Sequence, residues 1–205
     1  SGHIPAGMIA EQAIRAGFDE MQHMNFVFLN FMPDVKETRT PARFIEPAKR
    51  SGGIDVSSKQ VKDFIALLKE HKTVIDPTLV AFEGMITARN GSPDPSFATI
   101  INRLPANVRR GFLTGGLPVE DAATDKTYRA SFDNWKRMTK TLFDNGVPLV
   151  AGTDSLAGFA YHRELELYSQ SGIPNNKVLQ LATIGAARVM KRDTEFGSIA
   201  AGKFA

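Results

Sequence analysis

The sequence predicts an α/β fold in which amphipathic helices alternate with short, buried, parallel strands. A unit of helix, glycine stop, apolar strand and polar residue recurs along the chain without repeating its sequence. Short apolar runs are typical of strands buried on both faces, and an intervening helix is the usual connection between parallel strands. The length of 205 residues and the apolar fraction of 42% suit one domain or a large piece of one.

The first unit covers residues 8–23. Helical spacing over residues 10–16 ends at Gly17, which stands where a helix C-cap belongs. Residues 18–22 then predict a short strand that leads directly to His23. This unit therefore places an imidazole at the C-terminal end of a strand.

The second unit begins with Ser57 and Gln60, which together suit a capping box at the start of a helix. Residues 72–77 predict the strand that follows this helix. Between the capping box and this strand, four apolar residues follow helical spacing, namely Val61, Phe64, Ile65 and Leu68.

The third unit covers residues 125–154. Its helix ends near Gly146, and residues 147–151 predict a strand in spite of Pro148 near its start. Asp154 follows this strand. The apolar stripe of the helix consists of Tyr128, Phe132, Trp135, Met138 and Leu142.

The last part of the chain departs from the repeat. We expect a helix over residues 158–170, a break at 172–174, and further helix as far as Met190. A new segment starts near Gly197.

Two long connections, residues 24–56 and 88–124, are rich in proline, glycine and charged residues. Loops of this length are usually functional or disordered. Four phenylalanines favour a packed lid over a floppy linker for the first connection, and they are Phe26, Phe28, Phe31 and Phe44.

The composition excludes several classes of function. The 25 Lys and Arg residues against 22 Asp and Glu give a charge of +3 that is spread along the chain, so nucleic acid is not an implied partner. No apolar run reaches the roughly 20 residues of a membrane helix, and no signal-peptide layout is seen, so we expect a soluble chain of unknown compartment. Without cysteine, a metal must be held by imidazole and carboxylate, a donor set that suits zinc or manganese.

His3, His23 and Asp154 are the candidate metal ligands, because each stands where a strand is expected to end. In a (β/α) barrel the C-terminal ends of the strands face the catalytic mouth, so residues from three strands converge there. Each residue alone also has a structural interpretation: His23 as a core histidine, His3 as a surface residue, and Asp154 as a helix N-cap. His162 is expected to lie near the mouth as a second-shell or substrate-contacting group, whereas His71 complements a helix dipole and has no chemical role.

Several stretches, taken in order, resemble the amidohydrolase superfamily, and within it the imidazolonepropionase-like and prolidase-like branch. The resemblance implies the C-terminal half of a metal-dependent hydrolase (β/α)8 TIM barrel, about strands five to eight, incomplete at both ends. Residues 1–196 would belong to the barrel, and residues 197–205 would begin a C-terminal β-sandwich segment. The similar stretches are Ser1-Gly2-His3, residues 17–23, residues 146–154, residues 162–167, Ala182-Thr183, Ala186-Ala187, Gly197-Ser198-Ile199 and Gly202-Lys203.

The same resemblance implies a role for each candidate residue. His3 closes strand five, His23 strand six and Asp154 strand eight. The two histidines then bind a divalent metal, expected to be zinc, with one or two ions in the whole enzyme, and Asp154 shuttles the proton of the attacking water. The His-x-His pair of strand one and the carboxylated lysine of strand four are not found in the sequence. We therefore expect a missing N-terminal half of the barrel, and inactivity of this part alone.

Three functional hypotheses remain. The first is hydrolysis of an amide bond in a dipeptide or N-acyl amino acid, as in prolidases. The second is hydrolysis of a cyclic amide of the imidazolone type by the same residues. The third is of a different class, a non-catalytic truncated barrel that serves as a binding module. A homo-oligomer is compatible with all three.

Overall fold

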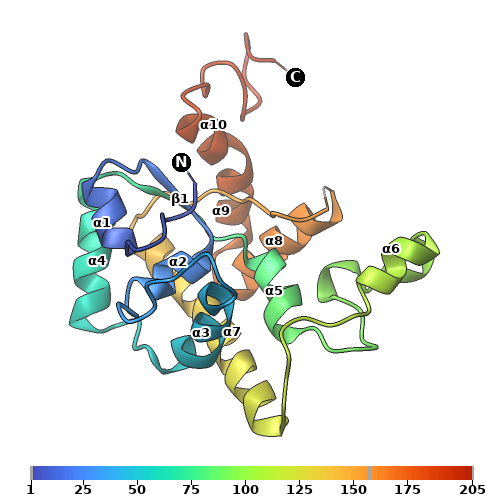
Figure 1. The fold of residues 1–205 in the computed structure, drawn as a ribbon. Coiled ribbons are helices and arrows are strands. Elements are labelled where there is room, and N and C mark those ends of the chain that lie inside the picture. The colour runs from blue at the N-terminus through green and yellow to red at the C-terminus, as the bar shows by residue number, and fades with distance from the viewer. Residues whose placement is uncertain (1, 157, 205) are drawn as a thin grey trace.

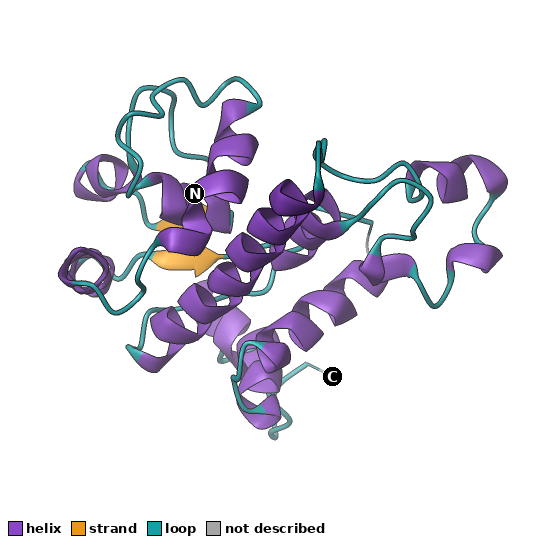
Figure 2. Cartoon of the chain, turned by 90° about the horizontal axis from the view of Figure 1, so that it is seen from below, coloured by secondary structure: helices purple, strands orange, loops and turns teal. Residues whose placement is uncertain are grey.

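The computed structural model describes residues 2–156 and 158–204. Ser1, Ala157 and Ala205 lie outside the described residues, and with them the outer limits of the two predicted segments 1–196 and 197–205. In the described part, helices predominate around a small parallel sheet (Figure 2). Its two strands are β1 (Glu20–Gln22) and β2 (Val74–Asp76). The fold is therefore a mostly helical α/β domain.

Helices account for most of the regular structure. No helix in residues 2–156 and 158–204 combines the length and the apolar character that a bilayer span requires. Short 3-10 helices form η1 (Ser51–Gly53), η2 (Pro95–Phe97) and η3 (Ile101–Arg103), and a π-helical turn forms η4 (Leu181–Gly185). The α-helices are α1 (Ala10–Arg15), α2 (Met24–Leu29), α3 (Ala42–Arg50), α4 (Lys59–Glu70), α5 (Leu79–Thr87), α6 (Ala106–Gly111), α7 (Ala122–Asp144), α8 (Phe159–Gln170), α9 (Asn175–Gln180) and α10 (Ala186–Val189).

Four backbone segments run parallel and side by side, which confirms the predicted parallel pairing. β1 pairs with β2 so that Met21 lies opposite Ile75. Single parallel bridges extend the sheet on both sides, from Gly2 to Met21 and from Ile75 to Leu149. The side chains of Met21, Ile75 and Leu149 are all buried. Since the segments are parallel, the residues that follow their C-terminal ends lie on one edge of the sheet. We call this edge the rim, and His3 and His23 lie on it.

The core is organised by α7, whose predicted apolar stripe is buried along its whole length. The Trp135 ring stacks on Phe28 with centroids 5.6 Å apart and contacts Phe82 at 4.8 Å. Its Nε1–H donates a hydrogen bond of 2.7 Å to Ser51 Oγ. Asn134 donates from Nδ2 to two backbone carbonyls of the turn that follows α3. The helix therefore joins α2, α3 and α5 into one packed unit.

Three local predictions differ from the structure. Residues 24–56 form α2 and α3 rather than a loop, although Phe26 and Phe28 are buried as the packed interpretation requires. The N-cap of α4 is Ser58, whose Oγ accepts from Val61 N, whereas Ser57 donates to Asp55. Residues 147–151 make a single bridge instead of a strand. Pro148, which has no backbone N–H, limits the ladder there.

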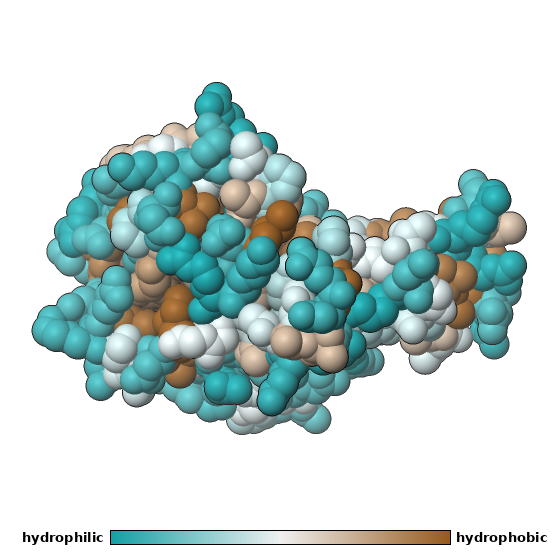
Figure 3. Space-filling view, turned by 60° about the horizontal axis from the view of Figure 1, so that its bottom comes forward, coloured by the Kyte–Doolittle hydropathy of each residue, from teal (hydrophilic) through white to brown (hydrophobic). Residues whose placement is uncertain are grey.

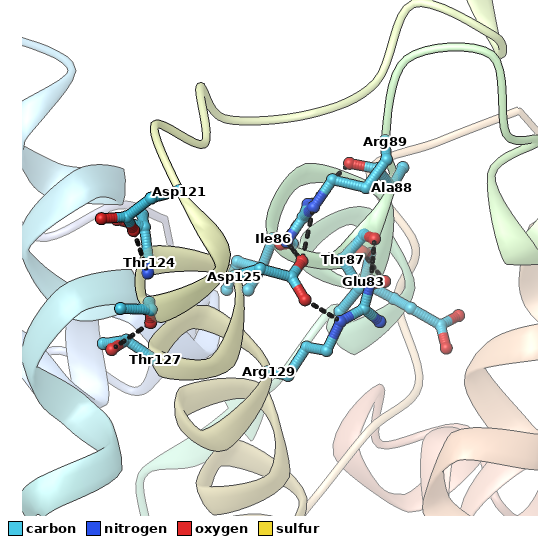
Figure 4. A network of polar contacts seen from close by, with 11 residues as sticks. Glu83, Ile86, Thr87, Ala88, Arg89, Asp121, Thr124, Asp125, Thr127 and Arg129 are labelled. Carbon is cyan, nitrogen blue, oxygen red and sulfur yellow. Dashed lines mark hydrogen bonds and ion pairs between the residues drawn. The ribbon is translucent and has the colours of Figure 1, made fainter.

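The connection between α5 and α7 projects from the rest of the molecule (Figures 1 and 3). It contains η2, η3 and α6, and α6 buries none of its residues. Its two ends are fastened together by Arg89, whose Nε donates to Asp125 Oδ1 at 2.7 Å (Figure 4). Within α7, Arg129 Nε donates to the other oxygen of Asp125 at 2.8 Å. Asp121 caps α7 by accepting from Thr124 N. This connection, which we call the excursion, therefore starts and ends at one cluster of polar side chains.

The C-terminal part confirms the predicted helix α8, the break after it and the further helix as far as Met190. Residues 191–204 form turns and bends beyond α10 (Figure 1). The start of a β-sandwich at residues 197–205 therefore stays a prediction.

Candidate active site

His3 and His23 meet at the C-terminal ends of two neighbouring segments of the sheet. His3 follows Gly2, which bridges to Met21, and His23 follows β1 directly. Their Nε2 atoms lie 2.8 Å apart, with ring centroids separated by 4.7 Å. Two imidazoles that face each other through Nε2 can share one proton or one cation.

The surroundings of His23 keep its imidazole neutral. The residue is buried, and its ring lies beside those of Phe26 and Phe82. Nδ1 lies 2.6 Å from Thr78 Oγ1, which fixes the ring orientation. Burial, together with the neighbouring His3, lowers the pKa of His23 to about 4. At neutral pH the ring is therefore uncharged, the form in which imidazole binds metal ions.

Asp154 lies on the same rim. Its Oδ2 is 3.8 Å from His23 Nε2, and 70% of its side-chain surface is exposed. This distance is too long for a hydrogen bond but short enough for both groups to contact one small ligand. The structure thus brings His3, His23 and Asp154 together from three parallel segments.

The rim is also where backbone strain is concentrated. Five non-glycine residues of the described part have a positive φ, and three of them are His23 (75°), Thr78 (46°) and Asp154 (43°). A left-handed conformation is most costly for a β-branched residue such as Thr78. Strain of this kind costs about 1–3 kcal/mol per residue and gathers at functional sites. The strain supports the rim as the functional part of the molecule.

Asp76, the last residue of β2, was missed by sequence reasoning. Its Oδ1 accepts a hydrogen bond of 2.8 Å from Gly152 N, and the nearby backbone N–H of Thr78 also stabilises the charged carboxylate. Burial raises the pKa of Asp76 to about 6. Its position at the end of a predicted strand, like that of His23, was the signal that could have identified it.

Most of this chain matches one known protein family. Residues 58–205 match the family model described as the amidohydrolase family. The chain belongs to the amidohydrolase family. The resemblance to the amidohydrolases that was inferred from the sequence motifs is therefore confirmed at the level of the family. No curated protein matches the chain.

Solved structures support the same fold for this amidohydrolase chain. A Xaa-Pro dipeptidase with methionine bound in its active site is 20% identical, with a TM-score of 0.52 over 95% of this chain and 34% of that one. The bottromycin amidohydrolase is 22% identical, with a TM-score of 0.56 over 96% of this chain and 42% of that one. The chain thus spans less than half the length of either protein.

The stretch 162–167, one of the amidohydrolase-like motifs, has a structural role at two of its positions. Glu164 is fully buried and accepts hydrogen bonds from Leu79 N at 3.0 Å and Val80 N at 2.7 Å. Arg163 donates two hydrogen bonds to the buried carboxylate of Glu83. Both contacts join α8 to α5, the helix that follows Thr78.

The other two histidines lie apart from the pair. His162 is exposed on α8 and lines a cavity of about 340 Å³ together with Pro95, Ser96 and Phe159. Its expected second-shell or substrate-contacting role stays a prediction. His71 is the exposed C-cap residue of α4, where the sequence predicted it.

The donor set fits part of a zinc site. Two Zn–N bonds of 2.0–2.1 Å at a tetrahedral angle place the two nitrogens about 3.3 Å apart. The Nε2 atoms of His3 and His23 are 2.8 Å apart, so a small outward rotation of either ring accommodates the ion. Within residues 2–156 and 158–204, no group of three or more His, Asp or Glu side chains forms a complete metal-holding cluster. The two histidines therefore fit as a pair of ligands that needs further donors.

Proposed function

We propose that this chain is part of a metal-dependent hydrolase that cleaves an amide bond in a dipeptide or an N-acyl amino acid, as prolidases do. The observation that carries the proposal is the convergence on one rim of His3, His23 and Asp154, with contacts of 2.8 and 3.8 Å. The family match supports amide hydrolysis in general. The likeness to a Xaa-Pro dipeptidase favours a dipeptide as the substrate.

The proposed cofactor is a divalent metal ion, with zinc expected, and its ligands in this chain are His3 and His23. When bound, zinc supplies a Lewis acid that acidifies a water molecule and polarises the amide carbonyl. The contact between Nδ1 of His23 and Thr78 Oγ1 directs Nε2 towards the shared position. Hydrogen bonds of this kind at the second nitrogen orient metal-binding imidazoles.

Asp154 is proposed as the proton shuttle and as a third contact to the same ion. Its exposed carboxylate takes a proton from the attacking water and passes it to the nitrogen of the breaking C–N bond. The nitrogen of the breaking bond is a poor leaving group until it is protonated, so cleavage requires this proton transfer. The lowered pKa of His23 makes its imidazole a weak base, which keeps that residue from competing for the same proton.

We further propose that the four parallel segments are strands five to eight of a (β/α)8 barrel. The residues at their ends, His3, His23 and Asp154, then face the catalytic mouth. The coverage of 34% and 42% of the two similar structures supports a larger whole, whose remaining strands would supply further ligands. Residues 1–196 would lie in the barrel, and 197–205 would begin the next segment.

The test is zinc analysis of the full-length protein alongside a hydrolysis screen of dipeptides, N-acyl amino acids and cyclic amides. His23→Ala is expected to lose zinc and activity, because it removes one of the two facing imidazoles. His71→Ala, at an exposed helix end, is the matched control and should retain both. Zinc content that is unchanged in His23→Ala would remove this residue from the site. Turnover of cyclic amides alone would change the substrate, and absence of both zinc and turnover would favour a binding module.

A further inference from the structure

We propose that Asp76 is a positioning residue that sets the separation between the His23 imidazole and the Asp154 carboxylate. The inference rests on the proposed function, because it assigns a task to a residue beside that site. One buried carboxylate at the end of β2 contacts the two backbone segments that carry these groups: it lies beside the N–H of Thr78 on one side and accepts a hydrogen bond from Gly152 N on the other.

The first attachment leads to His23. The backbone N–H of Thr78, two residues along the chain, lies beside the Asp76 carboxylate and stabilises its negative charge. This contact favours the left-handed conformation of Thr78, with φ of 46°. In that conformation Thr78 Oγ1 lies 2.6 Å from Nδ1 of His23. The carboxylate thereby controls which way Nε2 of His23 points.

The second attachment leads to Asp154. Gly152 N donates to Asp76 Oδ1 at 2.8 Å, and the backbone approaches so closely that a Cβ on Gly152 would stand 2.0 Å from Oδ2. Only glycine permits this approach. Asp154 follows two residues later with a left-handed φ of 43°. The contact therefore fixes the backbone position from which the Asp154 side chain extends.

Burying the Asp76 carboxylate costs free energy, which the groups that contact it must offset. Asp76 is 8% exposed, and among the described residues no lysine or arginine forms an ion pair with it. A buried carboxylate without a cationic partner is expensive unless its lone pairs are satisfied. Here Gly152 N donates a hydrogen bond to the carboxylate and the N–H of Thr78 lies beside it, and these are the two groups that lead to the site.

The first experiment measures zinc affinity, by competition with a chelator, in the full-length protein. Asp76→Asn keeps the shape of the side chain but replaces one acceptor oxygen with an NH2 group, so one of the two attachments is lost. We expect zinc affinity to fall about 10- to 100-fold, the usual effect of removing an orienting contact at a metal site. In the hydrolysis assay kcat should fall while KM changes less than about twofold.

Asp55→Asn is the matched control. Asp55 Oδ1 accepts from Ser57 N at 2.8 Å, so this carboxylate also engages the backbone N–H two residues along the chain, before α4. The zinc affinity and kcat of Asp55→Asn should equal those of the wild type, because the Asp55 carboxylate bonds to Ser57 and to neither Thr78 nor Gly152. Equal losses in the two variants would mean that any disrupted turn has this effect, and the positioning role would be overturned.

A double-mutant cycle gives an independent test. Gly152→Ala should weaken zinc binding, because its methyl group displaces the Asp76 carboxylate. In Asp76→Ala the obstructing carboxylate is gone, so adding Gly152→Ala should cost no further affinity. Additive losses would contradict the shared role. If Asp76→Asn unfolds at the assay temperature, Gly152→Ala alone still decides the matter.

A third readout does not depend on the metal. The 15N chemical shifts of the His23 ring report which nitrogen carries the proton, and they should change in Asp76→Asn but not in Asp55→Asn. If the wild type bound no zinc and cleaved no amide, the proposed function would fail while these shifts still tested the positioning role. If the wild type bound zinc and Asp76→Asn matched it in affinity, kcat and ring shifts, only the positioning role would fail.

Discussion

The buried carboxylate of Glu164 accepts a hydrogen bond of 2.7 Å from the backbone N–H of Val80, and so joins α8 to the first turn of α5. A second bond from Leu79 N, at 3.0 Å, engages the other carboxylate oxygen. Helix N-termini have free N–H groups that need acceptors, and here a side chain 84 residues away supplies them. The contact anchors the segment that carries Thr78, beside the candidate site.

Glu164→Ala should therefore destabilise the protein by about 2–4 kcal/mol, because two buried N–H groups lose their acceptor. The measurement is urea-induced unfolding. Glu166→Ala on the same helix is the control, since the Glu166 side chain is 60% exposed in its ion pair with Arg163 and should cost about 0–1 kcal/mol. Equal losses for the two variants would contradict a special role for Glu164.

The same residue predicts a pH dependence of stability. Burial raises the pKa of Glu164 to about 8, above the ordinary value of 4.5, so the folded state binds its proton more tightly than the unfolded chain. Stability from this group is then complete below pH 4.5 and is lost as the pH rises towards 8. Between about pH 6.5 and 8.5 the free energy of unfolding should fall by about 1–2 kcal/mol in the wild type.

Glu164→Gln, which cannot ionise, should show a flatter profile over the same range. The comparison is made by urea unfolding at several pH values. Since the lowered pKa of His23 acts mainly below its ordinary value of 6.5, that group contributes little in this window. An identical slope in the wild type and the variant would show that Glu164 does not titrate there.

Trp135→Ala should cost about 3–5 kcal/mol of unfolding free energy, because it leaves a large cavity between α2, α5 and α7. The ring is fully buried, and its hydrogen bond to Ser51 is lost as well. Phe159→Ala provides the contrast, since Phe159 is 51% exposed and should cost less than about 1 kcal/mol. A small loss for Trp135→Ala would contradict the central position assigned to α7.

Asp125→Asn should loosen the excursion between α5 and α7. The change weakens the contact to Arg89 that fastens its two ends together, as well as the contact to Arg129 within α7 (Figure 4). We expect faster amide hydrogen exchange over residues 90–120, with little change at β1 and β2. Exchange rates equal to those of the wild type would mean that other contacts at the base of the excursion hold it.

The sequence predicts the elements whose pattern is visible within one segment, and it does not predict those that depend on contacts between distant residues. The apolar stripe of α7 and the helix α8 were predicted because their spacing is visible within one segment. α5 was missed, since it is buried on nearly all sides and has no polar face to set a period. The N-cap of α4 was misplaced by one residue because Ser57 and Ser58 are adjacent and chemically alike.

The candidate site shows the same division. His3, His23 and Asp154 were identified because each follows a strand and because their order resembles that of the amidohydrolases. The position of Asp76 at the end of a predicted strand is visible in the sequence, but its hydrogen bond with Gly152, 76 residues away, is not.

The central claim is that His3 and His23 bind one metal ion, and X-ray absorption of the zinc-loaded full-length protein tests it most directly. The account predicts zinc with imidazole nitrogens at about 2.0–2.1 Å, and loss of one imidazole from the spectrum in each of His3→Ala and His23→Ala. A spectrum that keeps the same imidazole count in both variants would contradict it.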